Sequence, residues 1–437
     1  MRIAEVAKYL VDPKFGVIKH SGPMALEVGA PPLFSYFAYS SNTKPLTGWK
    51  NFGETGGVAP DRPIALAKAL GEAVERYCSA IYRKKDLPLT SVRKASFKCA
   101  SPELWDLYTE EQFEQESFPF VPFNEDTIVR WTPAFDLVKG FMIYIPAQSV
   151  YVPYYAFSQE DPERLLGQSI STGLACHETF IKGAISGICE VVERDALMIT
   201  WQAGISPPKI DLTTIPQHLK NLVKISKGLT GMIDIFDITL DNGIPTFLSA
   251  YRSSLKTETA FCMAAATAPA PEEALRKSLE ELVHTRRYSQ ILFQTHPPLS
   301  QETIETKNIR SKEEHLRFWA DHGNMDKASF LFQSEVCRSF CDVPSIATGQ
   351  DHKDLIALVK AISKTGHTVF IADITSPDIQ NLGLYVIRAV IPGYQPLQMG
   401  HSYRALGGSR LWTVPQKMGY RGIKKETGDI DLPHPYP

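Results

Sequence analysis

The stretch STGLACHETFIKGAISGICEVVERDA, residues 171–196, contains the pattern on which the prediction of the fold depends. From residue 178 to residue 201, apolar side chains recur at helical spacing, which predicts one long amphipathic helix. Glu190 and Glu193 lie three residues apart in this segment and are followed directly by Arg194. Because residues at positions i and i+3 project from the same face of a helix, the two carboxylates are expected to lie side by side.

An earlier segment repeats this arrangement. In ALAKALGEAVERYCSA, residues 65–80, Glu72 and Glu75 have the same spacing and are again followed by Arg. The apolar spacing predicts that this helix begins at about Ile64. A third long helix, over residues 271–293, carries Glu281 and His284 in the same i, i+3 relation.

Strand patterns alternate with these helices, and the chain has no low-complexity linker. Asp241-Asn242-Gly243 joins two of the strands and is a strong hairpin signal. Residues 53–63 are rich in Gly and Pro and are predicted to form a loop. The strands are expected in pairs, at residues 232–240 with 244–251 and at residues 367–375 with 384–392. The fold class predicted from these patterns is α/β.

The paired carboxylates indicate a metal site. Two ionised carboxylates among apolar neighbours repel one another unless a cation neutralises them. Oxygen ligands without nearby His or Cys favour Mg²⁺ over zinc, and Mg²⁺ held by few carboxylates completes its shell with water and phosphate oxygens. The pattern therefore points to a nucleotide, and Lys68 and Ser186, each one turn before an acidic pair, are candidates for the same site.

A simpler interpretation of these pairs stays open. Glu-x-x-Glu-Arg is common on exposed helices, where solvated charges support one another along the helix. The repetition of the motif favours the metal site over this alternative. A lone histidine such as His284 is more often a structural group than a ligand.

Composition narrows the class of protein further. The 437 residues carry 46 Lys and Arg against 48 Asp and Glu, so no broad basic field exists to bind a nucleic acid. No apolar run reaches the roughly 18 residues that a membrane span needs, and the first residues lack a secretory core, so we expect a cytoplasmic protein. The seven cysteines show no Cys-x-x-Cys zinc spacing and are expected to be reduced core thiols.

Taken together, these segments resemble the YcaO family, and specifically its azoline-forming cyclodehydratases, or heterocyclases, of ribosomal peptide natural product biosynthesis. The paired Glu-x-x-Glu-Arg motifs and a Pro-x-Pro-x-Pro end are far more specific jointly than any single match. The passages that carry the resemblance are residues 65–80, 171–196, 272–286, 386–411 and 433–437.

The resemblance implies a YcaO-type ATP-binding fold with mixed sheets, in which long acidic helices line the nucleotide site. It implies ATP and Mg²⁺ as cofactors, with a nucleotide-binding role for Ser186 and Glu281. Lys68 stands where the family often has Ser, and Val58 follows Gly56-Gly57 where the family often has a Gly-Lys-Gly-like loop. Lys68 is therefore expected to supply the missing cation. The residues that match the family's metal-binding positions are Glu72, Glu75, Glu190 and Glu193.

The implied activity is cyclodehydration of Cys, Ser or Thr in a precursor peptide to thiazoline or (methyl)oxazoline, through phosphorylation of the backbone amide oxygen. In azoline-forming members the Pro-rich tail enters the active site, so the carboxylate of Pro437 is the candidate catalytic proton acceptor. A thioamide-forming YcaO enzyme and a non-catalytic YcaO-like scaffold are the alternatives.

The expected organisation is an N-terminal segment packed on the core, residues 1–54, and a YcaO domain, residues 55–437, with the Pro-rich tail at 433–437. No further N-terminal domain of the size of a leader-peptide binder is expected. The predicted partners are therefore the precursor peptide and a separate E1-like or leader-peptide-binding protein, followed by a flavin-dependent azoline dehydrogenase that oxidises the rings. Neither nucleic acid nor a membrane is an expected partner.

Overall fold

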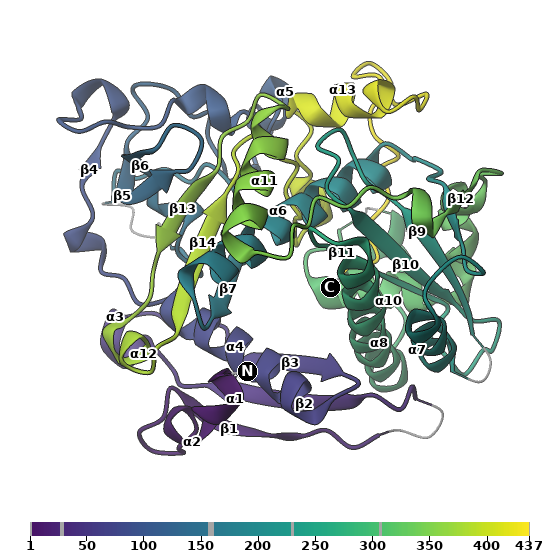
Figure 1. Ribbon diagram of the computed structural model, residues 1–437. Coiled ribbons are helices and arrows are strands. Elements are labelled where there is room, and N and C mark those ends of the chain that lie inside the picture. The colour runs from purple at the N-terminus through teal and green to yellow at the C-terminus, as the bar shows by residue number, and fades with distance from the viewer. Residues whose placement is uncertain (1, 27–29, 156–160, 229–230, 306–307, 437) are drawn as a thin grey trace. The chain divides into compact units, whose positions relative to one another are not determined.

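The computed structural model describes residues 2–26, 30–155, 161–228, 231–305 and 308–436 (Figure 1). The chain forms two compact units. Unit 1 comprises residues 1–24, 34–191 and 349–394, and unit 2 comprises residues 25–33, 192–348 and 395–437. The division falls within one long helix, α6 (Phe180–Gln202), between Val191 and Val192. Sheets and helices occur in both units, so the predicted α/β class is confirmed.

Unit 1 contains two sheets in the part of the chain that the structure describes, one of three strands and one of six. The smaller sheet has the order β1-β2-β3, and the larger has the order β4-β5-β13-β14-β7 with β6 paired to β5. The strands are β1 (Ile18–Pro23), β2 (Phe34–Ser40), β3 (Glu54–Ala59), β4 (Leu89–Thr90), β5 (Val129–Asp136), β6 (Phe141–Pro146), β7 (Leu174–His177), β13 (Phe370–Asp373) and β14 (Tyr385–Val390). Its helices besides α6 are α1 (Arg2–Glu5), α2 (Ala7–Leu10), α3 (Lys44–Thr47), α4 (Arg62–Cys78), α5 (Glu110–Phe113), α11 (Asp351–Ser363) and α12 (Pro377–Asn381).

The first acidic helix, α4, packs against β3 at very short range. The prediction of a loop over residues 53–63 is wrong, because Glu54–Ala59 forms strand β3. A β-carbon at Gly57 would lie 2.6 Å from the backbone nitrogen of Ala69 on α4, so this glycine serves close packing and makes no turn. The Thr55 hydroxyl donates a hydrogen bond of 2.9 Å to the Ala69 carbonyl and ties the strand to the helix.

The larger sheet of unit 1 is antiparallel throughout its described strands. The predicted pairing of residues 367–375 with 384–392 is confirmed by the antiparallel pair β13 and β14. Helix α6 approaches this sheet closely, since a β-carbon at Gly187 would lie 2.6 Å from the carbonyl oxygen of Gly173. This contact brings the second acidic helix beside the residue that precedes β7.

Unit 2 is built on a sheet of five described strands in the order β11-β10-β9-β8-β12. Strands β9 and β10 form the antiparallel pair predicted from the Asp241-Asn242-Gly243 signal. Strand β12 pairs with β8 in parallel. The strands are β8 (Lys209–Asp211), β9 (Met232–Asp237), β10 (Thr246–Arg252), β11 (Phe261–Thr267) and β12 (Cys337–Ser339). The helices are α7 (Gln217–Lys227), α8 (Pro271–Thr295), α9 (Gln301–Glu305), α10 (Lys312–Ala320) and α13 (Ser409–Lys417).

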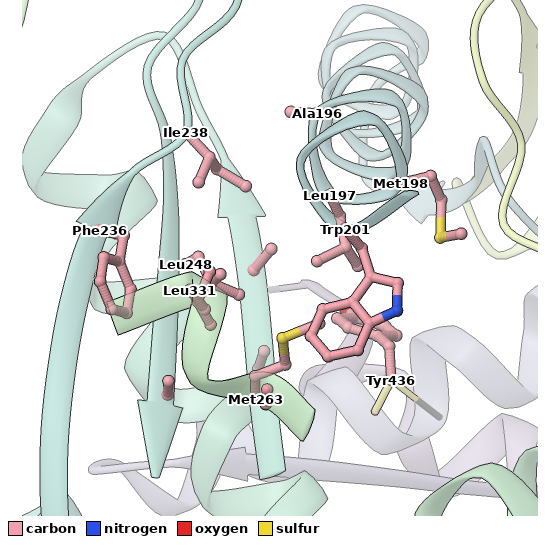
Figure 2. Packing of buried hydrophobic residues seen from close by; sticks show 14 of the residues in the cluster. Ala196, Leu197, Met198, Trp201, Phe236, Ile238, Leu248, Met263, Leu331 and Tyr436 are labelled. Atoms are coloured by element: carbon pink, nitrogen blue, oxygen red, sulfur yellow. The ribbon is translucent and has the colours of Figure 1, made fainter. Parts of the chain in front are cut away.

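The core of unit 2 includes residues from the end of the chain. Trp201 of α6 and Tyr436 belong to one buried cluster with Phe236, Leu248 and Met263 from β9, β10 and β11 (Figure 2). A buried aromatic ring removes roughly 150–250 Å² from water. At about 25 cal/mol per Å² this corresponds to at most about 4–6 kcal/mol, which favours a docked tail.

Among the described residues, no helix is both long enough and apolar enough to cross a bilayer.

Candidate functional site

Helix α4 brings two of the predicted metal ligands together on one face. Glu72 accepts a hydrogen bond of 2.8 Å from the Arg76 guanidinium one turn later, and its other oxygen lies 3.4 Å from the backbone N–H of Gly56. Glu75 accepts a hydrogen bond of 2.8 Å from the backbone N–H of Cys176 in β7. Glu72 is thus oriented mainly from within α4, and Glu75 by a backbone group of the strand on which α4 packs.

Glu190 on α6 is held in a comparable way. Its Oε2 accepts a hydrogen bond of 2.9 Å from the backbone N–H of Gly173. Gly173 has φ +91°, a conformation that favours glycine, and Gly187 allows α6 to approach it. The two glycines in the quoted stretch therefore set the distance between α6 and the donor that orients Glu190.

The pKa of Glu75 is raised, chiefly because its carboxyl group is buried. Burial raises this pKa to about 8, the neighbouring Arg76 charge opposes the shift, and the carboxylates of Glu72 and Glu190 add to it. A buried carboxylate with two others close enough to act on its charge offers the oxygen ligands that a hard divalent cation prefers. The residues present therefore fit a Mg²⁺ site.

Buried Arg388 on β14 is a residue of this region that sequence reasoning missed. Its Nε donates a hydrogen bond of 3.0 Å to the Ser149 carbonyl, whereas its Nη1 is buried without a hydrogen-bond partner among the described residues. Burial lowers the pKa of Arg388 to about 10, and the charge of Glu190 opposes this shift, so the guanidinium stays positive at neutral pH. A signal was present, because Arg388 lies within the quoted run of residues 386–411.

Lys68 and Ser186 occupy positions one turn before the acidic pairs. Lys68 is half-buried on α4 and its Nζ donates a hydrogen bond of 3.0 Å to the Val58 carbonyl. Ser186 is half-buried on α6, one turn before Glu190. Their assignment to the nucleotide stays a prediction.

Glu193, the fourth predicted metal ligand, belongs to unit 2. Its Oε1 accepts a hydrogen bond of 3.0 Å from the hydroxyl of Tyr436 and lies 3.6 Å from the Arg194 Nε. The Arg194 guanidinium stacks on the Tyr436 ring at 4.1 Å from its centroid. Burial raises the pKa of Tyr436 well above its ordinary value, and the negative charges of Glu193 and Glu281 add to this shift, so the hydroxyl keeps its proton and remains a donor.

The negative charge of Glu281 on α8 also raises the pKa of Tyr436. Its Oε1 lies 3.9 Å from the Nδ1 of His284. Within the described ranges, no three carboxylate, imidazole or thiol groups are already arranged as a metal-binding cluster.

The Pro-rich tail is fixed in unit 2 as far as Tyr436. The Trp201 indole N–H donates a hydrogen bond of 3.0 Å to the Leu432 carbonyl, and that of Trp319 donates one of 2.7 Å to the Pro433 carbonyl. Residues 433–436 are all buried. A disordered tail, which is the usual expectation for a chain end, is therefore not what forms here. Pro437, the predicted proton acceptor, lies outside the described residues.

Two neutral histidines secure the tail. The Nδ1 of His315 donates a hydrogen bond of 2.9 Å to the His434 carbonyl, and the rings of His315 and His434 stack at 4.1 Å. The Nε2 of His434 donates one of 2.7 Å to the Gln398 carbonyl. Each of these bonds needs its ring nitrogen to carry a proton, and burial favours the neutral ring.

Acid is expected to destabilise this docking. Burial lowers the pKa of His434 from 6.5 to about 4, so between these values the unfolded chain binds a proton that the folded chain does not. The free energy of unfolding therefore falls as the pH is lowered through this window. Thermal unfolding across this pH range, with His434→Gln as the comparison, measures the effect. The variant should show a shallower pH dependence, and an equal slope for both proteins would contradict the assignment.

The cysteines near the acidic helices do not offer a nucleophile. Burial raises the pKa of the Cys176 thiol well above its ordinary value, and Glu75 adds to the shift, so the reactive thiolate is disfavoured. Cys189 on α6 is also buried. The expectation that all seven cysteines are core thiols is wrong for Cys337 and Cys341, which are exposed; none of the seven takes part in a disulfide bond in the part of the chain that the structure describes.

Solved structures with similar folds include a heterocyclase, a YcaO protein and a microcin synthetase complex. A heterocyclase in complex with substrate and cofactor matches 100% of this chain and 57% of its own, with a TM-score of 0.77 and 20% identity. The YcaO protein of Methanopyrus kandleri, bound with AMPPCP and Mg²⁺, matches 90% of this chain and 90% of its own, with a TM-score of 0.63 and 18% identity. The E. coli microcin synthetase McbBCD complex with pro-MccB17 bound contains a chain that matches 94% of this one and 96% of its own, with a TM-score of 0.60 and 15% identity.

Sequence comparison identifies the family. An uncharacterised protein in the tfuA 3′ region of Rhizobium leguminosarum bv. trifolii is 26% identical over 195 residues, which are 43% of each chain. This chain thus spans less than two thirds of the length of that relative and of the first heterocyclase above. The model of the family described as YcaO cyclodehydratase, ATP- and Mg²⁺-binding, matches residues 56–395. Since this match covers most of the sequence, the chain belongs to the YcaO family.

Proposed function

We propose that this chain uses ATP and Mg²⁺ to convert Cys, Ser and Thr residues of a ribosomally made precursor peptide into thiazolines and (methyl)oxazolines. The observation that carries the proposal is the set of acidic side chains in unit 1, where Glu75 and Glu190 each accept a backbone N–H and lie close enough for their charges to interact. The family description names ATP- and Mg²⁺-binding cyclodehydratases, and similar folds include heterocyclases. Both support this assignment over a scaffold without turnover.

The proposed reaction has three steps. The side-chain sulfur or oxygen of the substrate bonds to the preceding amide carbon, and its proton passes to a base. The resulting amide oxyanion attacks the γ-phosphorus of ATP, and ADP leaves. Loss of the amide N–H proton then forms the C=N bond as phosphate departs, so that one ring forms for each ATP converted to ADP and phosphate. Enclosure of the reacting groups would supply much of the rate enhancement by alignment.

Each predicted residue has a role in this scheme. Lys68, Ser186 and Glu281 are proposed to contact the nucleotide, and the buried positive charge of Arg388 suits a phosphate oxygen. When bound, Mg²⁺ would neutralise charge on the phosphate groups of ATP. The carboxylate of Pro437 is proposed to accept a proton or to position the group that does. The side chains proposed to hold Mg²⁺ are Glu72, Glu75, Glu190 and Glu193.

The proposal includes partners and a location. The substrate is the precursor peptide, presented by a separate E1-like or leader-peptide-binding protein. A flavin-dependent dehydrogenase would oxidise the azolines afterwards. The cytoplasm is the proposed location because it supplies ATP. We also propose the division into an N-terminal segment, residues 1–54, and a YcaO domain, residues 55–437.

Mass spectrometry of the precursor peptide tests the proposed function. Incubation with this protein, its partner, ATP and Mg²⁺ is expected to remove one water from the peptide for each ring formed. Omission of ATP, or addition of EDTA, should prevent the loss of water. Replacement of an oxygen by sulfur would show thioamidation instead. An unmodified peptide in a reaction where the protein binds both nucleotide and peptide would favour the scaffold.

A further inference from the structure

Three of the proposed metal ligands, Glu75, Glu190 and Glu193, are oriented by two different kinds of donor. Glu75 accepts a backbone N–H from Cys176. Glu190 accepts one from Gly173. These donors are part of the main chain, and their positions are set when the strands and helices form. Glu193 instead accepts a side-chain hydroxyl from the tail.

We propose that Tyr436 is a positioning residue for the metal site, because its hydroxyl orients the Glu193 carboxylate. The inference rests on the proposed function, in which Glu193 is a ligand of Mg²⁺. Groups that hydrogen-bond to a metal ligand fix its orientation, and their loss typically weakens metal affinity by about 10- to 100-fold. The tail would thus serve metal binding as well as proton transfer.

The Tyr436 hydroxyl restricts the orientation of the Glu193 carboxylate. Its bond of 3.0 Å engages Oε1 of Glu193 and limits rotation of the carboxylate. The Nε of Arg194 lies 3.6 Å from the same Oε1 and is a competing cation. Without the hydroxyl, the carboxylate is expected to turn toward this guanidinium and to bind a metal less well.

Burial of Tyr436 fixes the position from which its hydroxyl donates to Glu193. Tyr436 is only 2% exposed, and its ring packs in the core of unit 2 while stacking on Arg194. Removal of the hydroxyl alone leaves the ring, the stacking and the rest of the tail in place. Tyr436→Phe therefore separates orientation of Glu193 from docking of the tail.

The chain contains a matched control. The Tyr251 hydroxyl also donates to a glutamate, at 2.6 Å from Oε2 of Glu258, and the Arg286 guanidinium also stacks on its ring, at 4.0 Å. Tyr251 belongs to the same buried cluster. Tyr251→Phe thus removes the same kind of bond from the same core without touching a proposed metal ligand.

Titration of Mg²⁺ into protein saturated with AMPPCP tests the inference. We expect Tyr436→Phe to bind Mg²⁺ about 10- to 100-fold more weakly than the unchanged protein, and Tyr251→Phe to bind it normally. In the peptide assay, Tyr436→Phe should require more Mg²⁺ but approach normal turnover when Mg²⁺ is saturating. Thermal unfolding in EDTA should be similar for the two variants.

Each other outcome has a defined meaning. Unchanged Mg²⁺ affinity in Tyr436→Phe would overturn the inference, and so would an equal loss in Tyr251→Phe, since it would reflect general destabilisation. Glu193→Gln distinguishes a failure of the proposed function: if the unchanged protein binds Mg²⁺ with AMPPCP but Glu193→Gln binds it equally well, Glu193 is not a ligand. Absence of Mg²⁺-dependent binding in the unchanged protein would overturn the proposed function itself.

Discussion

Extension of the chain by one glycine after Pro437 is expected to slow ring formation by roughly 10²- to 10⁴-fold, the usual scale of general base catalysis. The added residue moves the carboxylate by one peptide unit. Buried contacts fix the chain as far as Tyr436, so the displaced group cannot regain its place by a shift of the tail. The measurement is azoline formation by the extended and the unextended protein at saturating ATP, Mg²⁺ and peptide.

Mg²⁺ and nucleotide affinity of the same proteins provide the control. The extension keeps Tyr436 and all four acidic residues, so both affinities should stay close to normal. Deletion of residues 433–437 is a less selective test, because it also removes the hydroxyl that contacts Glu193. Normal ring formation by the extended protein would remove the Pro437 carboxylate from the mechanism and make thioamidation a stronger alternative.

Glu75→Gln and Glu193→Gln are each expected to weaken Mg²⁺ binding by more than the roughly 10- to 100-fold expected from loss of a group that hydrogen-bonds to a metal ligand, because each removes a proposed ligand itself.

The raised pKa of Glu75 also predicts that Mg²⁺ affinity depends on pH. Its pKa is raised to about 8, so the metal-free folded protein holds a proton there that Mg²⁺ must displace. Below this pH, affinity of the unchanged protein should fall by about tenfold per unit, and Glu75→Gln should lose this dependence.

Calorimetric titration with Mg²⁺ in buffers of different ionisation enthalpy measures both quantities. The raised pKa also means that the metal-free fold loses stability as the pH rises from 4.5 to about 8, since the ionised carboxylate is disfavoured when buried. Thermal unfolding in EDTA should therefore show that Glu75→Gln retains its fold. Near-normal turnover of both variants at limiting Mg²⁺ would refute the metal assignment.

Local patterns were sufficient to predict the long helices. Helix α4 begins at Arg62, two residues before the expected Ile64, because the Asp61 side chain accepts the Ile64 N–H and Pro63 suits the first turn. Helices α6 and α8 follow their predicted segments closely. The acidic pairs could be found in the same way, since i, i+3 spacing is a property of neighbouring residues.

Features that depend on tertiary packing escaped this reasoning. The glycines of β3 resemble those of a loop in sequence, and only the close approach of α4 explains Gly57. Tyr436 contacts Glu193 across 243 residues of sequence, a separation over which no periodic pattern carries information. Arg388 lies in a run that carried the family resemblance, but its burial was missed because its surroundings come from distant segments.

The burial of the tail has a consequence for synthesis on the ribosome. The Trp201 indole N–H donates to the Leu432 carbonyl, 231 residues later in the chain. At the faster of the usual synthesis rates, roughly 5–20 residues per second, about 12 s pass between translation of the two residues. During that interval the nascent unit 2 lacks the tail residues that complete its core, so its aromatic side chains are open to chaperones and to aggregation.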